Sequence, residues 1–186
     1  MIGLTPDHLY VDDETGRTYP GVTSIIKDVG LMGYLPDYDD YYLKRGTYVH
    51  EATALWDRGL LEENDLAPGL VWFLAAWKKY RGDTGFTPAP DFIERICFDP
   101  VLGYCGTVDR DGVDLKSGVP CAWHVLQASG YWHFAGSTKA PWQSVYLHDD
   151  GTYKVKVYAP QELYAAFGVF CAALTLYNWK RENKIQ

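Results

Sequence analysis

The sequence predicts a mixed α/β domain, and three observations support this prediction. Long segments carry apolar residues at helical spacing, whereas shorter segments alternate and end in Asp-Pro or Asp-Gly turns. These segments follow one another in the order helices, strands, helix, strands, helix. No internal repeat, low-complexity tract or linker divides the 186 residues. We therefore expect one domain with a central mixed sheet, mostly an antiparallel meander, and helices on its sides.

The N-terminal part is expected to form a flank on the main core. Residues 8–26 predict a hairpin that turns at residues 13–16, followed by a segment from residue 19 in which a short helix begins. Within the single domain we expect this flank over residues 1–38 and the core over residues 39–182.

Two helices are expected next along the chain. Between residues 39 and 59 the side chains of Val49, Thr53 and Trp56 recur at helical spacing. Residues 66–80 place apolar side chains on one helical face and end before an Arg-Gly-Asp sequence. Both segments therefore predict amphipathic helices.

The middle of the chain predicts three short strands. The runs 92–98, 102–109 and 113–117 are separated by Asp-Pro and Asp-Gly dipeptides, which favour tight turns. This pattern is typical of a three-stranded antiparallel meander.

The last third of the chain predicts a helix, a hairpin and a final helix. Residues 120–134 and 160–180 each begin with proline, which suits the first position of a helix. Between these helices, residues 142–147 and 152–158 flank an Asp-Asp-Gly turn and predict a second hairpin.

The composition favours a cytoplasmic protein that does not hold nucleic acid by bulk charge. The N-terminus has no apolar run, and the longest uncharged stretch, residues 163–179, is shorter than the roughly 20 residues of a membrane span. The formal net charge is −7, whereas phosphate binding relies on clustered Lys and Arg. A nucleic-acid function therefore needs local positive charge, which bound metal ions can supply in part.

The cysteines argue against a metal cluster. The four of them stand singly, without the paired spacing of zinc or iron–sulfur ligands: Cys97, Cys105, Cys121 and Cys171. We expect small apolar side chains at these positions and no iron–sulfur cluster.

The Asp-Gly turn at residues 111–112 brings two acidic side chains together. A two-residue turn of this type fixes the register of its strands, so that Arg110 faces Val113. One position further from the turn, Asp109 then faces Asp114, with Cβ atoms about 4.5–5.5 Å apart. Lys116 lies two residues beyond Asp114 and points to the same face.

This arrangement favours a divalent metal ion. Two facing carboxylates repel each other unless a proton or a cation lies between them. Oxygen ligands favour Mg²⁺ or Mn²⁺, and a neighbouring lysine can stabilise charge on a phosphate. The alternative is structural: aspartate is common beside glycine in turns, and Lys116 would be a solvated strand residue.

Three segments in this part of the chain carry further information. They are Gly106-Thr107-Val108-Asp109, Asp114-Leu115-Lys116-Ser117-Gly118 and Gln127-Ala128-Ser129-Gly130-Tyr131. In order and spacing they resemble the RecB-type branch of the PD-(D/E)XK nucleases. Upstream, the segment from Arg45 to His50 is similar to the first helix of that family, and Glu94 matches a Glu on the strand before the hairpin. Residues 19–26 also resemble phage-type members.

The resemblance implies a metal centre and a catalytic lysine. Asp109 and Asp114 would bind Mg²⁺ or Mn²⁺. The carbonyl of Leu115 and the side chain of His50 would complete the ligand set, with Glu94 as an additional ligand. Lys116 would be the catalytic lysine, acting together with Asp109 and Asp114.

The resemblance also implies a surface for DNA. Gln127 and Tyr131 lie four residues apart, so on a helix they share a face, from which they would approach DNA or brace the site. Trp123, four residues earlier, extends that row. The implied protein has a restriction-endonuclease-like core and hydrolyses DNA, as an exonuclease in recombination, repair or phage DNA processing. Further copies of the chain or a recombination protein are the candidate protein partners.

Other hypotheses stay open at this stage. The chain could be a catalytically inactive module that keeps the nuclease fold and binds nucleic acid or protein. It could also be an acidic mimic of DNA, although its acids are dispersed. At single positions, His50 and Glu94 could be ordinary surface residues, and Trp123 and Tyr131 could be core residues.

Overall fold

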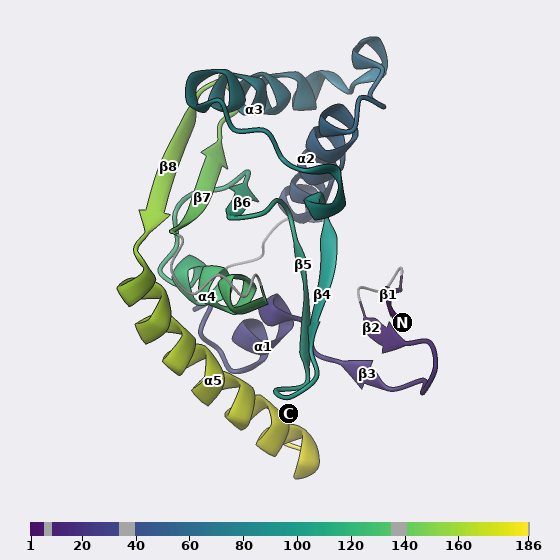
Figure 1. Cartoon of the computed structure of the whole chain (residues 1–186), viewed down its shortest axis with the longest axis vertical. Helices are drawn as coiled ribbons and strands as arrows, with labels where there is room; N and C mark the ends of the chain where they lie inside the picture. Colours follow the sequence, from purple (N-terminus) through teal and green to yellow (C-terminus); the bar gives the residue numbers. More distant parts are fainter. Residues whose placement is uncertain (6–8, 34–39, 135–140, 186) are drawn as a thin grey trace.

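The computed structural model describes residues 1–5, 9–33, 40–134 and 141–185, and over these it is a mixed α/β fold (Figure 1). Its strands are β1 (Ile2–Leu4), β2 (Tyr10–Asp12), β3 (Thr18–Tyr19), β4 (Arg95–Asp99), β5 (Tyr104–Val108), β6 (Val113–Lys116), β7 (Trp142–Leu147) and β8 (Tyr153–Tyr158). Its α-helices are α1 (Val22–Asp28), α2 (Asp40–Asp57), α3 (Val71–Thr84), α4 (His124–Phe134) and α5 (Pro160–Glu182). Short 3₁₀ turns occur at Glu63–Asp65, Pro68–Leu70 and Pro90–Phe92.

The N-terminal hairpin is confirmed as β2 and β3, and β1 pairs with β2 to complete a three-stranded antiparallel sheet. Helix α1 follows directly and packs against α4 and α5. Its side chains Val22, Ile25 and Ile26 are almost fully buried. The expected flank therefore contributes a helix to the core, while its expected boundary at residues 38–39 lies outside the described residues.

The expected meander is wrong at its third strand. Strands β4 and β5 pair antiparallel as predicted, but β6 joins β5 only through one bridge, between Arg110 and Val113. Strand β6 instead pairs in parallel with β7, and β7 pairs antiparallel with β8. The reason is that α4 crosses over between β6 and β7, and such a crossover connection aligns two strands in the same direction.

The predicted helices are confirmed in type, but two of them have shifted bounds. Helices α2 and α5 occupy the expected segments, whereas α3 begins at Val71 rather than at residue 66, after the 3₁₀ turn Pro68–Leu70, and it ends at Thr84 rather than before residue 81. Helix α4 begins at His124 rather than at Pro120, because residues 117–123 form a bend, an irregular stretch and a turn. None of the helices that the structure describes has the length and apolar character needed to cross a membrane.

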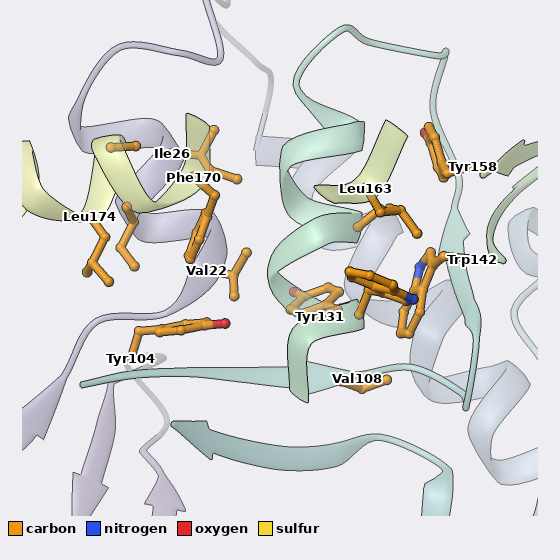
Figure 2. Close-up of a cluster of buried hydrophobic side chains, with 14 of the residues drawn as sticks. Val22, Ile26, Tyr104, Val108, Tyr131, Trp142, Tyr158, Leu163, Phe170 and Leu174 are labelled. Carbon is orange, nitrogen blue, oxygen red and sulfur yellow. The ribbon is translucent and has the colours of Figure 1, made fainter. Parts of the chain in front are cut away.

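Two groups of buried side chains form the core. The first, the α5 cluster, joins α1, α4 and α5 to β5 and β7 (Figure 2), and its labelled members are Val22, Ile26, Tyr104, Val108, Tyr131, Trp142, Tyr158, Leu163, Phe170 and Leu174. The second, the α3 cluster, joins α2 and α3 to β6 and β7: Val49, Phe73, Ala76, Trp77, Tyr80, Val113, Leu115, Val145 and Leu147. Strand β7 contributes to both clusters, through Trp142 to the first and through Val145 and Leu147 to the second.

Gly106 in β5 leaves no room for a side chain. A Cβ atom there would lie 2.7 Å from Cε1 of Tyr131 and 3.1 Å from Cε2 of Phe134. We expect Gly106→Ala to lower the free energy of unfolding by about 1–3 kcal/mol, as overpacking does. The control is Gly82→Ala in α3, where no atom lies within 4 Å and the same methyl should add about 0.5–1 kcal/mol of stability. Urea unfolding measures both, and equal effects would contradict the close packing at Gly106.

Candidate active site

The alternation of β6 decides which side chains face the site. Val113 and Leu115 belong to the α3 cluster. Because successive strand residues point to opposite faces, Asp114 and Lys116 point away from that cluster. Two charged side chains are therefore directed to the same side of the strand, as the sequence predicts.

The turn between β5 and β6 has the predicted register, but the ladder stops after one pair. The bridge between Arg110 and Val113 is present, whereas Asp109 and Asp114 do not form a further ladder pair. Instead, Oδ2 of Asp109 accepts a 2.6 Å hydrogen bond from the backbone N–H of Leu115. Asp109 and Asp114 nevertheless line one cavity together.

Asp114 and Lys116 are in direct contact. The Nζ atom of Lys116 donates to Oδ1 of Asp114 at 2.6 Å, and the hydroxyl of Ser144 donates to Oδ2 at 3.0 Å. Ser144 is the partner of Asp114 in the β6–β7 register, so the parallel pairing supplies this second contact. The side chain of Asp114 is only 2% exposed. Both of its oxygens therefore have a donor, and the carboxylate is almost fully buried.

Gln127 holds Lys116 from the other side. Its Oε1 accepts from Nζ of Lys116 at 2.8 Å, while its Nε2 donates to Oγ1 of Thr23 at 3.0 Å and to the hydroxyl of Tyr131 at 3.2 Å. The two donor bonds fix which way the amide points. Gln127 and Tyr131 of α4 are thus in contact on one face, and Gln127 orients the lysine, whereas Trp123 of the predicted row lies just before the helix begins.

A second group of possible ligand atoms comes from three elements. His50 lies in α2, Glu94 directly precedes β4 and Asp109 directly follows β5. Atoms of His50, Glu94 and Asp109 all lie within 4.8 Å of one another. The Nδ1 atom of His50 is 3.2 Å from Oδ1 of Asp109 and 3.8 Å from Oε1 of Glu94. Glu94 adopts a left-handed backbone conformation, with φ of 50°. Such a conformation is costly for a non-glycine residue and is often found at functional sites.

These three side chains fit a divalent metal ion. Bonds of about 2.0–2.2 Å to nitrogen and oxygen place neighbouring ligands roughly 3–4.5 Å apart. The distances from Nδ1 of His50 to the two carboxylates, 3.2 and 3.8 Å, fall in that range, and two carboxylates with one imidazole suit Mn²⁺ and are compatible with Mg²⁺. His50, Glu94 and Asp109 are therefore the residues that could hold a metal.

The structure divides the predicted ligand set. His50, Glu94 and Asp109 are brought together, whereas Asp114 is not part of that group and has Lys116 and Ser144 as its partners. Leu115 lines a cavity together with Asp109 and Asp114, and it is a ladder residue of β6, paired with Val145.

A network of ion pairs adjoins His50, Glu94 and Asp109, and the sequence analysis does not predict it. Arg110 is fully buried, and its Nε donates to Oδ2 of Asp57 at 2.6 Å. Its Nη1 donates to Oε1 of Glu94 at 3.1 Å and to the carbonyl of Asp109 at 2.5 Å. The side chain of Asp57 has no exposure and also accepts from Arg81 at 2.7 Å. No local pattern marks these residues, because their partners are separated by up to 53 positions along the chain.

All predicted site residues except Glu94 line one cavity of about 720 Å³. Its walls come from α1, α2, the β5–β6 region and the start of α4. The lining residues are Thr23, Lys27, Met32, Arg45, Gly46, His50, Asp109, Asp114, Leu115, Lys116, Ser117, Gly118, Val119, Cys121, Trp123, His124, Gln127 and Tyr131.

The protonation states of His50, Glu94 and Asp109 depend on one another. Burial alone would lower the pKa of His50, but Asp109 and Glu94 raise it to about 10. Burial alone would raise the pKa of Asp109, but His50, Lys116 and the N–H of Leu115 bring it below its ordinary value. Without a metal ion, a proton on His50 therefore serves as the cation between the two acids. A metal ion that binds there takes the place of that proton.

Asp114 has the opposite shift. Burial raises the pKa of its carboxyl above the ordinary value, and the charge of Asp109 adds to that increase. Lys116 and the hydroxyl of Ser144 act against it. The two acids are thus distinct: Asp109 favours the ionised form, whereas the ionised form of Asp114 depends on its partners.

Comparison of the chain with protein-family models and with curated proteins gives no match.

The buried network predicts a large cost for removing one charge. Asp57→Asn would remove the fully buried carboxylate that pairs with Arg110 and Arg81, leaving Arg110 only the partly exposed Glu94 as an ionic partner, and we expect a loss of about 3–5 kcal/mol in the free energy of unfolding. The matched control is Asp83→Asn, which breaks an exposed pair with Lys79 and should cost no more than about 1 kcal/mol. Urea unfolding distinguishes the two, and similar losses would contradict the role of Asp57.

His124 predicts a pH dependence of stability. Its Nδ1 lies 2.8 Å from the hydroxyl of Tyr146 and accepts from the N–H of Cys121. Burial, and then the charge of Lys116, lower its pKa to about 3. Since the folded pKa lies below the unfolded value of about 6.5, the unfolded chain binds the proton first. Stability is therefore complete above that value and falls as the pH decreases toward 3.

The measurement compares the wild type with His124→Asn at pH 7 and pH 5. We expect the wild type to lose about 2 kcal/mol more than the variant over this range, from 1.4 kcal/mol per pKa unit. Equal losses would show that His124 is not held in its neutral form.

Proposed function

We propose that the chain is a divalent-metal-dependent DNA nuclease of the PD-(D/E)XK type. The observation that carries the proposal is the contact between Nζ of Lys116 and the buried carboxylate of Asp114, in one cavity with Asp109. A lysine held beside two almost fully buried acids, with a metal-binding group adjoining, suits the hydrolysis of a phosphodiester.

The metal part of the proposal rests on the donor set. His50, Glu94 and Asp109 would hold Mg²⁺ or Mn²⁺. When bound, such an ion supplies Lewis-acid activation of a phosphoryl oxygen and lowers the pKa of a water molecule. Arg110 keeps Glu94 in place while it stays paired with Asp57, so the ligand has a fixed position before any ion arrives.

Lys116 would stabilise the charge that develops on the phosphate. Hydrolysis adds water across the bond between phosphorus and the ester oxygen, which leaves a phosphate monoester on one fragment and a hydroxyl on the other. Negative charge increases on the non-bridging oxygens as the water oxygen attacks. An ammonium group held by Asp114 and Gln127 is already oriented, so little reorganisation is needed during the reaction.

The topology supports the finer assignment to a restriction-endonuclease-like core. The acids lie at the junction of the β4–β5 hairpin and β6, and α4 crosses over from β6 to the parallel strand β7. The proposal includes exonuclease action on DNA in the cytoplasm, in recombination, repair or phage DNA processing.

The test is cleavage of labelled single- and double-stranded DNA with Mg²⁺ or Mn²⁺. We expect cleavage that EDTA abolishes. Lys116→Ala should lower the rate by roughly 100-fold or more, the loss typical of removing one stabilising charge or donor. Asp114→Asn should have a similar effect, because it removes the carboxylate that orients Lys116.

The control is Lys79→Ala, which removes a lysine on α3 that pairs with Asp83 and does not line the cavity. Circular dichroism of each variant establishes that it is folded. Cleavage at the wild-type rate in folded Lys116→Ala would reject the assignment. DNA binding without cleavage by the unaltered chain would favour the inactive module instead.

A further inference from the structure

The outer side of α5 lacks the polar character of an ordinary surface helix. The helix packs against α1 and α4 and runs along the outside of the molecule (Figure 1). No charged residue occurs between residues 163 and 179, although Val169, Leu176 and Trp179 are 48%, 45% and 52% exposed. A helix that is apolar on all sides is normally buried. The exposed side of α5 is therefore suited to contact with another surface.

The exposed apolar residues of α5 follow the spacing of a helix pair. The residues Ala165, Val169, Ala172, Leu176 and Trp179 are all exposed and are separated by four, three, four and three positions. This alternation is the repeat with which one helix packs along another at a small angle. We call these five residues the α5 strip.

The α5 strip is complementary in size to a second copy of itself in the antiparallel orientation. With Ala172 on a two-fold axis, Trp179 of each copy lies opposite Ala165 of the other, because the two positions are equally far from residue 172. Val169 then lies beside Leu176 of the second copy. The largest side chain thus meets one of the smallest at both ends. Such reciprocal contacts are what a two-fold interface requires.

The charges at the ends of α5 favour the same orientation. Glu162 lies in the first turn, whereas the last turn carries Lys180 and Arg181 and is followed by Lys184. Antiparallel packing brings the acidic end of one copy to the basic end of the other, and it also opposes the two helix dipoles. Glu162 and Lys180 already have partners in their own chain. The end charges therefore set the orientation more than the affinity.

Other contacts fit this side of the molecule less well. A helix that lies on a membrane presents large apolar side chains to the lipid, whereas Ala165 and Ala172 of the α5 strip bury little area but allow another helix to approach closely. The nearby edge strand β8 carries exposed Lys154 and Lys156. Lysines on an edge strand hinder pairing with the edge of another sheet.

We propose that the chain forms a homodimer in which two α5 strips pack antiparallel about a two-fold axis at Ala172. The helix has 23 residues and is about 35 Å long at 1.5 Å per residue. One helix pair of this length lies at the low end of specific interfaces, so we expect dissociation in the micromolar range. No residue of α5 lines the cavity that contains Asp109 and Asp114. The dimer is therefore independent of the proposed nuclease activity.

The first test is sedimentation equilibrium of the full chain from nanomolar to high micromolar concentration. We expect the average mass to rise from that of one chain to that of two. Ala172→Glu places two negative charges against each other at the axis, and it should weaken dimerisation by roughly 30-fold or more, as the loss of a central interface residue does.

The matched control is Asn178→Glu, which adds the same charge at an exposed position of α5 outside the strip. It should leave dimerisation nearly unchanged. Both substituted positions are exposed, and circular dichroism establishes that each variant is folded.

Disulfide cross-linking tests the orientation. In the antiparallel dimer the introduced thiols of Ala172→Cys face each other at the axis, so mild oxidation should link the two chains. The thiols of Ala165→Cys would be separated by about 21 Å along the helices, beyond the Cα separation of about 7 Å that a disulfide can span. In a parallel dimer both variants would cross-link. The unaltered chain, with its four cysteines, gives the background.

Three outcomes would overturn the proposal. The first is a chain that stays monomeric at every concentration; if that monomer binds vesicles of phosphatidylcholine and phosphatidylserine, a lipid surface is the partner of α5 instead. The second is self-association that Ala172→Glu leaves unchanged. The third is cross-linking of Ala165→Cys to the same extent as Ala172→Cys.

Discussion

The guanidinium of Arg110 holds together the parts of the chain from which the site is built. It pairs with Asp57 at the end of α2, with Glu94 before β4 and with the carbonyl of Asp109 after β5. A fully buried guanidinium is tolerated only when its donors are occupied, since an unpaired buried charge costs several kcal/mol. The three segments are therefore fixed relative to one another by the need to satisfy one side chain. The positions of two metal-binding candidates, Glu94 and Asp109, follow from that constraint.

The lysine side of the site depends on a different element. Strand β6 supplies Asp114 and Lys116, and its parallel neighbour β7 supplies Ser144. Gln127 of α4 reaches Lys116 only because α4 crosses the sheet between these two strands. Thr23 of α1 then fixes the amide of Gln127, so a helix from the N-terminal part of the chain acts on the lysine through one intermediate. The site is thus assembled from α1, α4, β6 and β7 on one side and from α2 and the start of β4 on the other.

Local patterns in the sequence predict the local features and miss those that depend on distant partners. Helical spacing predicts α2 and α3, a proline at the first position predicts α5, and the Asp-Gly turn predicts the bridge from Arg110 to Val113. The same turn suggests that β6 continues a meander, which is wrong because the choice of strand partner depends on a crossover of about 25 residues. Likewise, alternation in β6 predicts that Asp114 and Lys116 share a face, but no spacing shows that Asp57 pairs with Arg110. Only the family resemblance predicts His50 and Glu94 as site residues. In the structure their ligand atoms lie within 4.8 Å of one another and of Asp109.

The acidic net charge of the chain is compatible with the proposed polyanionic ligand, because many of the acids are paired with cationic side chains. The buried carboxylates of the site face Arg110, Lys116 and His50, and exposed acids such as Glu63 and Asp83 pair with lysines of α3. The cavity itself is lined by Lys27, Arg45 and Lys116, and their local positive field is screened less in a narrow space than on an open surface. A net charge of −7 still opposes binding at long range. For the proposed nuclease, the binding of DNA would therefore depend on few contacts at short distance.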